Sequence, residues 1–312
     1  MTSQQIAPVL FLIFNRPDVT QQVFDEIRKA KPSQLFIAAD GPRGGNENDV
    51  IRCAKTREVV TQIDWECEVK TLFREENLGC GKAVSGAITW FFDNVEAGII
   101  LEDDCLPNQS FFSFTSQMLD LHKDDCQVFH ISGYTWVDSD NLDKPYYFMR
   151  YSNIWGWATW KRAWAHYNYR MSNISDDNLE GILSELSLTK EERYFQRMTF
   201  NETVRGNVDT WDYQWKFAIF KAKGYCVTPK YTLIENIGNV SGATRNINLR
   251  NALKVRNEPI KIDDSRLPLL DVEFENQHRI KYIWPKANYF YTLKSFKQKV
   301  KNVLMKVKRI FN

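Results

Sequence analysis

Runs of consecutive apolar residues recur along the N-terminal half of the chain, and each of the longest runs ends at a polar residue. "PVLFLIF" ends at Asn15, "LFIAA" ends at Asp40, and "GIIL" ends at Glu102. Strands that are buried on both faces of a parallel sheet are continuously apolar, whereas half-exposed strands alternate. These three runs are therefore predicted to be buried strands, and "CEVKTLF" and "VFHISG" are predicted to be two further strands.

Segments with a helical pattern separate the predicted strands. Pro17 and Asp18 suit the first turn of a helix, and Val19, Val23 and Ile27 then give this helix one apolar stripe. "ENLGCGKAV" is a glycine-containing loop that opens another helix. Strands that alternate with helices predict an α/β fold, in which a mostly parallel, Rossmann-like sheet is flanked by helices.

Polar side chains stand where four of the predicted strands end. In open parallel sheets, ligands bind at the carboxyl ends of the strands. The polar residues at these ends, which we expect to converge on one edge of the sheet, are Asn15, Arg16, Asp40, Arg74, Glu102, Asp103 and Asp104.

Three of these residues are adjacent carboxylic acids, Glu102, Asp103 and Asp104, directly after a buried run. Adjacent carboxylates repel one another unless a positive group lies beside them. Oxygen ligands of this kind suit a hard divalent cation such as Mg²⁺ or Mn²⁺, which usually keeps several waters and also binds substrate phosphates. The sequence therefore predicts that the missing positive charge is a metal ion bound together with a diphosphate.

Composition limits the class of protein. Hydrophobic residues make up 43% of the 312 residues, and the formal net charge is +2, which gives no indication of a nucleic-acid partner. The six cysteines include no C-x-x-C pair, so we expect free thiols in a reducing compartment. The first apolar run, Val9 to Phe14, is too short for a signal peptide or a membrane span, and the expected location is the cytoplasm.

The basic residues are unevenly distributed. Residues 290–312 contain seven basic residues and no acid, so the rest of the chain is net acidic. On a helical wheel, the apolar residues of this segment occupy an arc on the order of 120°. A basic amphipathic helix of this kind is expected to bind an anionic membrane surface, on the inner face of the cell membrane. A terminal helix packed on the domain is the alternative that the sequence leaves open.

The first three strand ends also resemble a known family. "PVLFLIFNRPDVTQQVFDEI", "LFIAADGPRGG" and "GIILEDDCLPNQSFFSF" follow one another with the spacing found in GT-A glycosyltransferases. They resemble most closely N-acetylglucosaminyltransferase I and its bacterial nucleotide-diphospho-sugar transferase relatives. The resemblance covers residues 8–245, and it is strong to about residue 115. It implies a transferase domain over residues 1–245, followed by a loop-rich extension over 246–289 and the basic helix over 290–312.

The resemblance implies a role for each matched residue at the donor. Arg16 is expected near the nucleotide phosphates and Asp40 at the uracil. Asp103 is expected to face the ribose or sugar and to lie close to the metal. Asp104 is expected to bind the metal directly, as in a DXD motif. Glu102 belongs to the same donor-binding set. Lys82, in the loop before the helix, is expected to approach the donor phosphates.

The resemblance further implies an inverting reaction that uses a UDP-sugar and Mn²⁺ or Mg²⁺. Inversion requires a general base that takes the proton of the acceptor hydroxyl. "DTWDYQW" corresponds to the segment that holds this base in the family, so Asp212 is the predicted base and Asp209 is the reserve. "IWGWATW" corresponds to a loop beside donor and acceptor, where Trp155 and Trp157 are expected to form a platform for a sugar ring. Tryptophans packed in the core are the alternative that the sequence leaves equally open.

The predicted function is therefore the transfer of a sugar, N-acetylglucosamine or a relative, to a glycan or a lipid-linked acceptor in surface-polysaccharide synthesis. A retaining transferase of the same fold is one alternative, and a binding protein that retains only the nucleotide-sugar pocket is another. A nucleotidyltransferase should have a glycine-rich basic loop directly after the first strand, and "FNRPDV" contains no glycine.

Overall fold

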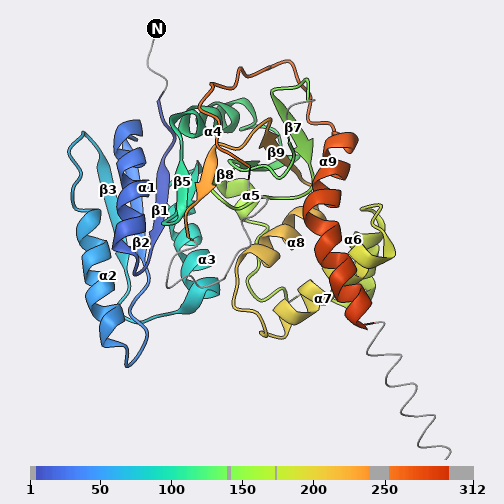
Figure 1. The fold of residues 1–312 in the computed structure, drawn as a ribbon, viewed down its shortest axis with the longest axis horizontal. Helices are drawn as coiled ribbons and strands as arrows, with labels where there is room; N and C mark the ends of the chain where they lie inside the picture. The colour runs from blue at the N-terminus through green and yellow to red at the C-terminus, as the bar shows by residue number, and fades with distance from the viewer. Residues whose placement is uncertain (1–4, 139–141, 173, 239–252, 295–312) are drawn as a thin grey trace, which may run out of the picture.

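The computed structural model describes residues 5–138, 142–172, 174–238 and 253–294. Within these residues, an eight-stranded sheet has the order β3-β2-β1-β4-β8-β6-β9-β7 and is flanked by helices (Figure 1). The strands are β1 (Val9–Ile13), β2 (Gln34–Ala39), β3 (Glu68–Phe73), β4 (Ala97–Glu102), β5 (Cys105–Pro107), β6 (Val128–Ser132), β7 (Tyr146–Met149), β8 (Trp157–Trp160), β9 (Tyr225–Pro229) and β10 (Ile234–Asn236). The helices are α1 (Pro17–Ala30), α2 (Glu47–Val59), α3 (Gly79–Phe92), α4 (Gln109–Leu121), α5 (Lys161–Trp164), α6 (Asp176–Ser184), α7 (Lys190–Val204), α8 (Asp212–Ala222) and α9 (Val272–His278).

The N-terminal half of the sheet is parallel, as predicted. β3, β2, β1 and β4 are parallel neighbours, and Leu12 of β1 lies opposite Glu102 of β4. Every residue of β1 is buried, which is the burial that its continuous apolar run predicted. The five predicted strands are confirmed as β1, β2, β3, β4 and β6. The α/β class with a mostly parallel sheet is thereby confirmed.

The C-terminal half of the sheet is mixed. β8 pairs antiparallel with both β4 and β6, and it therefore inserts between them. A separate two-stranded ribbon joins β5 to β10, with Asn236 opposite Cys105. This ribbon places the residues after β10 next to the acids that follow β4.

Tryptophans join β8 to α8 in the core between the two halves. Trp157 of β8 stacks on Trp211 with ring centroids 5.4 Å apart and on His130 at 5.0 Å. The indole N–H of Trp215 donates to His130 Nδ1 at 3.2 Å, and His130 Nε2 donates to the carbonyl of Asn153 at 3.0 Å. The neutral imidazole is thus fully hydrogen-bonded, and burial lowers its pKa to about 3. His130 is a structural residue.

The C-terminal segment differs from the prediction. Residues 246–289 were expected to be loop-rich, but α9 begins at Val272, and the helix continues through a π turn (Arg279–Ile283) to residue 294. The helix therefore crosses residue 290, where the sequence placed the boundary between the two segments. Pro285 lies just after the π turn, and proline has no N–H for the carbonyl one turn earlier. The wider turn accommodates this loss within a continuous helix.

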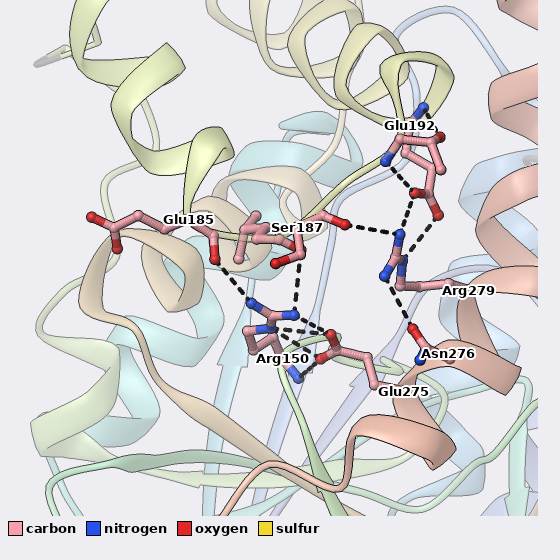
Figure 2. Close-up of polar contacts among 9 residues, drawn as sticks. Arg150, Glu185, Ser187, Glu192, Glu275, Asn276 and Arg279 are labelled. Carbon is pink, nitrogen blue, oxygen red and sulfur yellow. Dashed lines mark hydrogen bonds and ion pairs between the residues drawn. The ribbon is translucent and has the colours of Figure 1, made fainter.

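Two buried ion pairs hold α9 on the body of the protein (Figure 2). Glu275 accepts hydrogen bonds from Arg150, and Glu192 of α7 accepts from Arg279. The side chains of both glutamates are 2% exposed, so each must keep its partner to avoid an uncompensated buried charge. Phe290 also stacks on Phe195 of α7 at 5.7 Å. The part of the C-terminal helix that the structure describes thus packs on the domain.

The predicted basic amphipathic helix over 290–312 lies mostly outside the described residues. Among the helices that the structure describes, none combines the length and the apolarity required to cross a bilayer.

Candidate functional site

A cavity of about 820 Å³ lies at the carboxyl ends of β1, β2 and β4. All seven polar residues that the sequence placed at strand ends line it. The opposite wall comes from the start of α3 and from the segment that leads into α8. The structure therefore brings together side chains that lie up to about 200 residues apart in the chain.

The positive group beside the acids is a guanidinium. Arg16 donates two hydrogen bonds to Asp103, one from Nε to Oδ2 at 3.3 Å and one from a terminal nitrogen to Oδ1. Its other terminal nitrogen donates to Asp104 Oδ2 at 3.0 Å. Burial alone would disfavour this charge, but Asp103 and Asp104 raise the pKa of Arg16 above its usual value. The sequence predicted a metal ion bound together with a diphosphate as the positive group beside these acids. The structure places Arg16 there, and the metal ion stays a prediction.

Glu102 behaves differently from its two neighbours. Burial raises the pKa of Glu102 to about 8, and the negative charges of Asp104 and Asp103 add to the effect. The protonated form of this side chain is therefore favoured. Burial also raises the pKa of Asp103, to about 6, although Arg16 opposes this effect.

Backbone from β10 packs closely against Asp104. The N–H of Ile237 donates to the carbonyl of Asp104 at 2.9 Å, and a Cβ atom on Gly238 would collide with Asp104 Oδ2. Only glycine allows this approach. The segment "ENIG" therefore closes one side of the acidic motif, and the loop that follows it lies outside the described residues.

The donor set suits a cation that is completed by ligand and water. In the part of the chain that the structure describes, no three His, Cys, Asp or Glu side chains form a metal-binding group. Both oxygens of Asp103 are bonded to Arg16, whereas among the described residues Asp104 Oδ1 has only the thiol of Cys105 at 3.6 Å. Mg²⁺ commonly binds one or two carboxylates together with substrate phosphates. Asp104 fits this pattern, and Asp103 fits it only after Arg16 moves.

Asp40 organises the loop before α3. Its oxygens accept hydrogen bonds from Leu78 N at 3.0 Å, Gly79 N at 3.2 Å and Asn77 Nδ2 at 3.0 Å. Asp40 lines the cavity, but these bonds already use the oxygens that the predicted uracil contact requires. The observed role of this carboxylate is to hold the loop.

Asp209 caps the same helix from the other side. Its carboxylate accepts from Cys80 N at 3.0 Å and from Gly81 N at 2.8 Å, although Asp209 lies 128 residues from Gly81 in the chain. A Cβ atom on Gly81 would lie 2.7 Å from Asp209 Oδ1, so the glycines of "LGCG" allow the close contact. Asp209, the predicted reserve base, therefore positions the segment that leads to Asp212.

Asp212 begins α8 and lines the cavity across from the acids. The hydroxyl of Thr210 donates to Asp212 Oδ1, which fixes the carboxylate. The charge of Asp212 also contributes to the raised pKa of Glu102, so the two groups interact through the cavity. The predicted base is thus placed beside the acidic motif.

Two predicted site residues do not face the cavity. Trp157 is completely buried, with His130 and Trp211 stacked against its ring, so the predicted sugar platform is wrong at this position. Lys82 is exposed on α3 and is not part of the cavity lining, which contradicts its predicted phosphate contact in this conformation. Trp155 does line the cavity.

Arg43 lines the cavity and was missed by the sequence analysis. It donates to Asp49, which is 1% exposed and also accepts from Asn15 Nδ2 at 2.8 Å. The segment "DGPR" placed this arginine three residues after Asp40, but a single surface arginine in a loop carries no distinctive signal.

Comparisons with known proteins add no argument to this geometry. No protein-family model and no curated protein matches the chain. Among solved structures, 4-diphosphocytidyl-2C-methyl-D-erythritol synthase from Anaerococcus prevotii is similar with a TM-score of 0.31 and 9% identity, over 55% of this chain and 80% of that one. A UDP-glucose pyrophosphorylase complexed with UDP-glucose is similar with a TM-score of 0.33 and 10% identity, over 73% of this chain and 91% of that one. At these scores, neither similarity carries a functional conclusion.

We predict that Glu102 makes the stability of the ligand-free protein depend on pH. Its folded-state pKa of about 8 lies above the ordinary value of 4.5, so the folded protein binds this proton more tightly. Stability should therefore fall as the pH rises from about 4.5 to about 8. Glu102→Gln should remove this loss and melt several degrees above the wild type at pH 9, since about 1 kcal/mol shifts Tm by roughly 2–4 °C in domains of 150–250 residues.

Thermal unfolding between pH 5 and pH 9 tests this prediction. Glu96→Gln is the matched control, because the Glu96 side chain is 87% exposed. If the melting temperatures of wild type and Glu102→Gln change with pH in parallel, the prediction is wrong, because the pKa of Glu102 would then not be raised.

Proposed function

We propose that this protein is a metal-dependent, inverting glycosyltransferase. It transfers a sugar, N-acetylglucosamine or a relative, from a UDP-sugar to a glycan or lipid-linked acceptor in surface-polysaccharide synthesis. The observation that carries the proposal is the opposition of two groups in one cavity. Arg16, Asp103 and Asp104 lie at the ends of parallel strands, and Asp212 lies at the start of α8 across from them.

The strand-end wall is suited to a nucleotide diphosphate. Arg16, Arg43 and Arg74 all line the cavity, and arginine binds phosphate oxygens through two parallel N–H bonds. The cavity volume of about 820 Å³ lies within the range of small-ligand sites. In the ligand-free protein, Arg16 is bonded to Asp103 and Asp104. When a diphosphate binds, the guanidinium of Arg16 would therefore exchange these carboxylates for phosphate oxygens.

That exchange would free Asp104 to hold Mn²⁺ or Mg²⁺. When bound, such an ion neutralises charge on the departing diphosphate. Asp103, which remains close to Arg16, would face the ribose or sugar. The protein's own contribution is to hold both carboxylates with Arg16 until the donor arrives.

Asp212 would take the acceptor proton. In the reaction, the acceptor oxygen forms a bond to the anomeric carbon while the bond from that carbon to the diphosphate breaks, and the hydroxyl proton passes to Asp212. Inversion follows because the acceptor attacks from the face opposite the leaving group. The hydrogen bond from Thr210 holds one oxygen of Asp212 in place. The second oxygen is then the one that accepts the proton.

The C-terminal helix supports association with a membrane. Several apolar side chains in and before this helix are between 46% and 70% exposed, namely Leu267, Leu269, Val272, Ile280, Trp284 and Tyr289. The basic residues of 290–312 follow them directly in the sequence. Exposed apolar groups next to clustered lysines favour an anionic lipid surface, at the inner face of the cell membrane, where a lipid-linked acceptor would be within reach.

Asp104→Ala should remove the metal-dependent part of UDP binding. We expect the wild type to bind UDP at least tenfold more tightly with Mn²⁺ than with EDTA, and the variant to bind equally in both, because it lacks the free carboxylate oxygen. Titration calorimetry measures this, with the exposed Asp124→Ala as control. A metal response that persists in Asp104→Ala would place the cation elsewhere.

Asp212→Asn should preserve UDP binding and lower sugar transfer by about 10²–10⁴-fold, the usual contribution of a general base. The assay is UDP release from a panel of UDP-sugars, with free saccharides and polyprenyl phosphates as acceptors, and Asp124→Asn is the control. A wild type that binds UDP-sugars without transfer to any acceptor would instead indicate a nucleotide-sugar-binding protein. Full activity in Asp212→Asn would exclude Asp212 as the base.

Membrane association predicts binding to vesicles of phosphatidylcholine with 30% phosphatidylglycerol, and weak binding to phosphatidylcholine alone. Replacing both Ile280 and Trp284 with alanine should reduce the bound fraction severalfold in co-sedimentation at low salt. Equal binding to both kinds of vesicle, or none to either, would contradict the proposal.

A further inference from the structure

Two lysines from different elements converge on Asp212. Lys216 lies one turn after Asp212 on α8, and Lys286 lies on the C-terminal helix. The charge of Asp212 acts on both ammonium groups, and the charge of Lys286 acts on Lys216. Three charged groups therefore share one small region beside the cavity.

The two lysines contact aromatic rings rather than carboxylates. Lys216 Nζ lies 5.0 Å from the ring centroid of Tyr213, and Lys286 Nζ lies 3.5 Å from that of Tyr282. Within the described residues, neither ammonium group has a carboxylate close enough for an ion pair. Burial lowers the pKa of Lys216 to about 8, against the opposing effect of Asp212. Lys216 is partly buried, and an amine with so little compensation costs stability, which is typical of positions that bind a ligand.

A row of aromatic rings connects these lysines to the cavity. Trp155 lines the cavity, and the ring of Trp136 lies 5.2 Å from that of Trp155. Tyr282 stacks on Trp136, with centroids 4.5 Å apart and an angle of 17° between the rings. Trp136 and Tyr282 are only partly buried, so both side chains are partly accessible to solvent. Accessible aromatic side chains are common contacts of sugars.

The C-terminal helix holds its two contributing side chains in fixed positions. Tyr282 and Lys286 are four residues apart and thus lie on the same helix face. Buried pairs between Glu275 and Arg150, and between Glu192 and Arg279, fix the preceding turns of this helix (Figure 2). A binding group on a docked helix is held more precisely than one on a loop.

We infer that Lys216, Lys286, Trp136 and Tyr282 form an acceptor subsite that binds a saccharide carrying an anionic group. The inference rests on the proposed function, because it is the transfer reaction that makes the second substrate an acceptor. The rings would hold the sugar, the two lysines would bind its anion, and the acceptor hydroxyl would lie at Asp212. The anion is a carboxylate in an acidic sugar or a phosphate in a lipid-linked one, and either satisfies two ammonium groups.

Ligand-observed NMR titrations on the full chain, saturated with UDP and Mn²⁺, test the subsite. The probes are methyl β-D-glucuronide, glucose 1-phosphate and neutral methyl β-D-glucoside. We expect at least one anionic probe to bind tenfold or more tightly than the neutral one. Replacing both Lys216 and Lys286 with methionine should reduce that affinity to the neutral level. UDP binding should be unchanged, because both lysines lie outside the cavity lining.

Two matched variants control for the loss of a positive charge. Lys221→Met removes an exposed lysine from α8, and Lys281→Met removes one from the C-terminal helix. Both should keep wild-type affinity for the anionic probe, and Lys216→Met should melt no lower than the wild type because it removes a poorly compensated charge.

Each outcome decides the inference. Preference for the glucuronide indicates an acidic-sugar acceptor, and preference for the phosphate indicates a phosphorylated one. If the wild type binds UDP but no anionic probe better than the glucoside, or if the double variant keeps the preference, the subsite is wrong. If UDP does not bind but the lysine-dependent preference persists, the proposed function fails while the anionic-saccharide site stands.

Discussion

The ion pairs of Arg16 with Asp103 and Asp104 are the interaction on which the rest of the site depends. β1 and β4 are parallel neighbours with Leu12 opposite Glu102, so the residues that follow both strands meet at one edge of the sheet. Carboxylates packed this closely in a buried place would repel one another without a cation. Arg16 supplies one positive charge from the protein itself, and the raised pKa of Glu102 favours its neutral form. One guanidinium beside two carboxylates leaves a net negative charge that suits a cation, and a diphosphate must compete with the carboxylates for the guanidinium.

The sequence predicted the parallel half of the sheet because burial on both faces leaves continuous apolar runs. It did not predict β8, since the short segment "WATW" lies in a tryptophan-rich stretch that was interpreted as a loop. Those tryptophans fill the core between β8 and α8. Tertiary packing determines their positions, and it leaves no periodic pattern in the sequence. α9 was missed for a related reason. Pro285 interrupts the helical pattern, and only the packing of the helix on α7 and β7 shows that the chain stays helical there, with a π turn before this proline.

Strand ends could be assigned to one site because parallel topology alone brings Arg16, Asp40 and Asp104 together. The individual roles could not be assigned, because they depend on backbone donors. Asp40 and Asp209 accept hydrogen bonds from the first N–H groups of α3, and a carboxylate with this role has the same sequence signal as a catalytic acid. The electrostatic effect of Asp212 on Lys286 depends on a helix that docks from the far end of the chain, which no local pattern indicates.

The central claim is that Arg16 occupies the acidic motif only until a diphosphate replaces the carboxylates. A crystal structure of the complex with UDP and Mn²⁺ tests it most directly. We expect the guanidinium of Arg16 to bond to phosphate oxygens and Asp104 to coordinate the ion. A complex in which UDP is bound while Arg16 still bonds to both Asp103 and Asp104, with no ion at Asp104, would contradict the account.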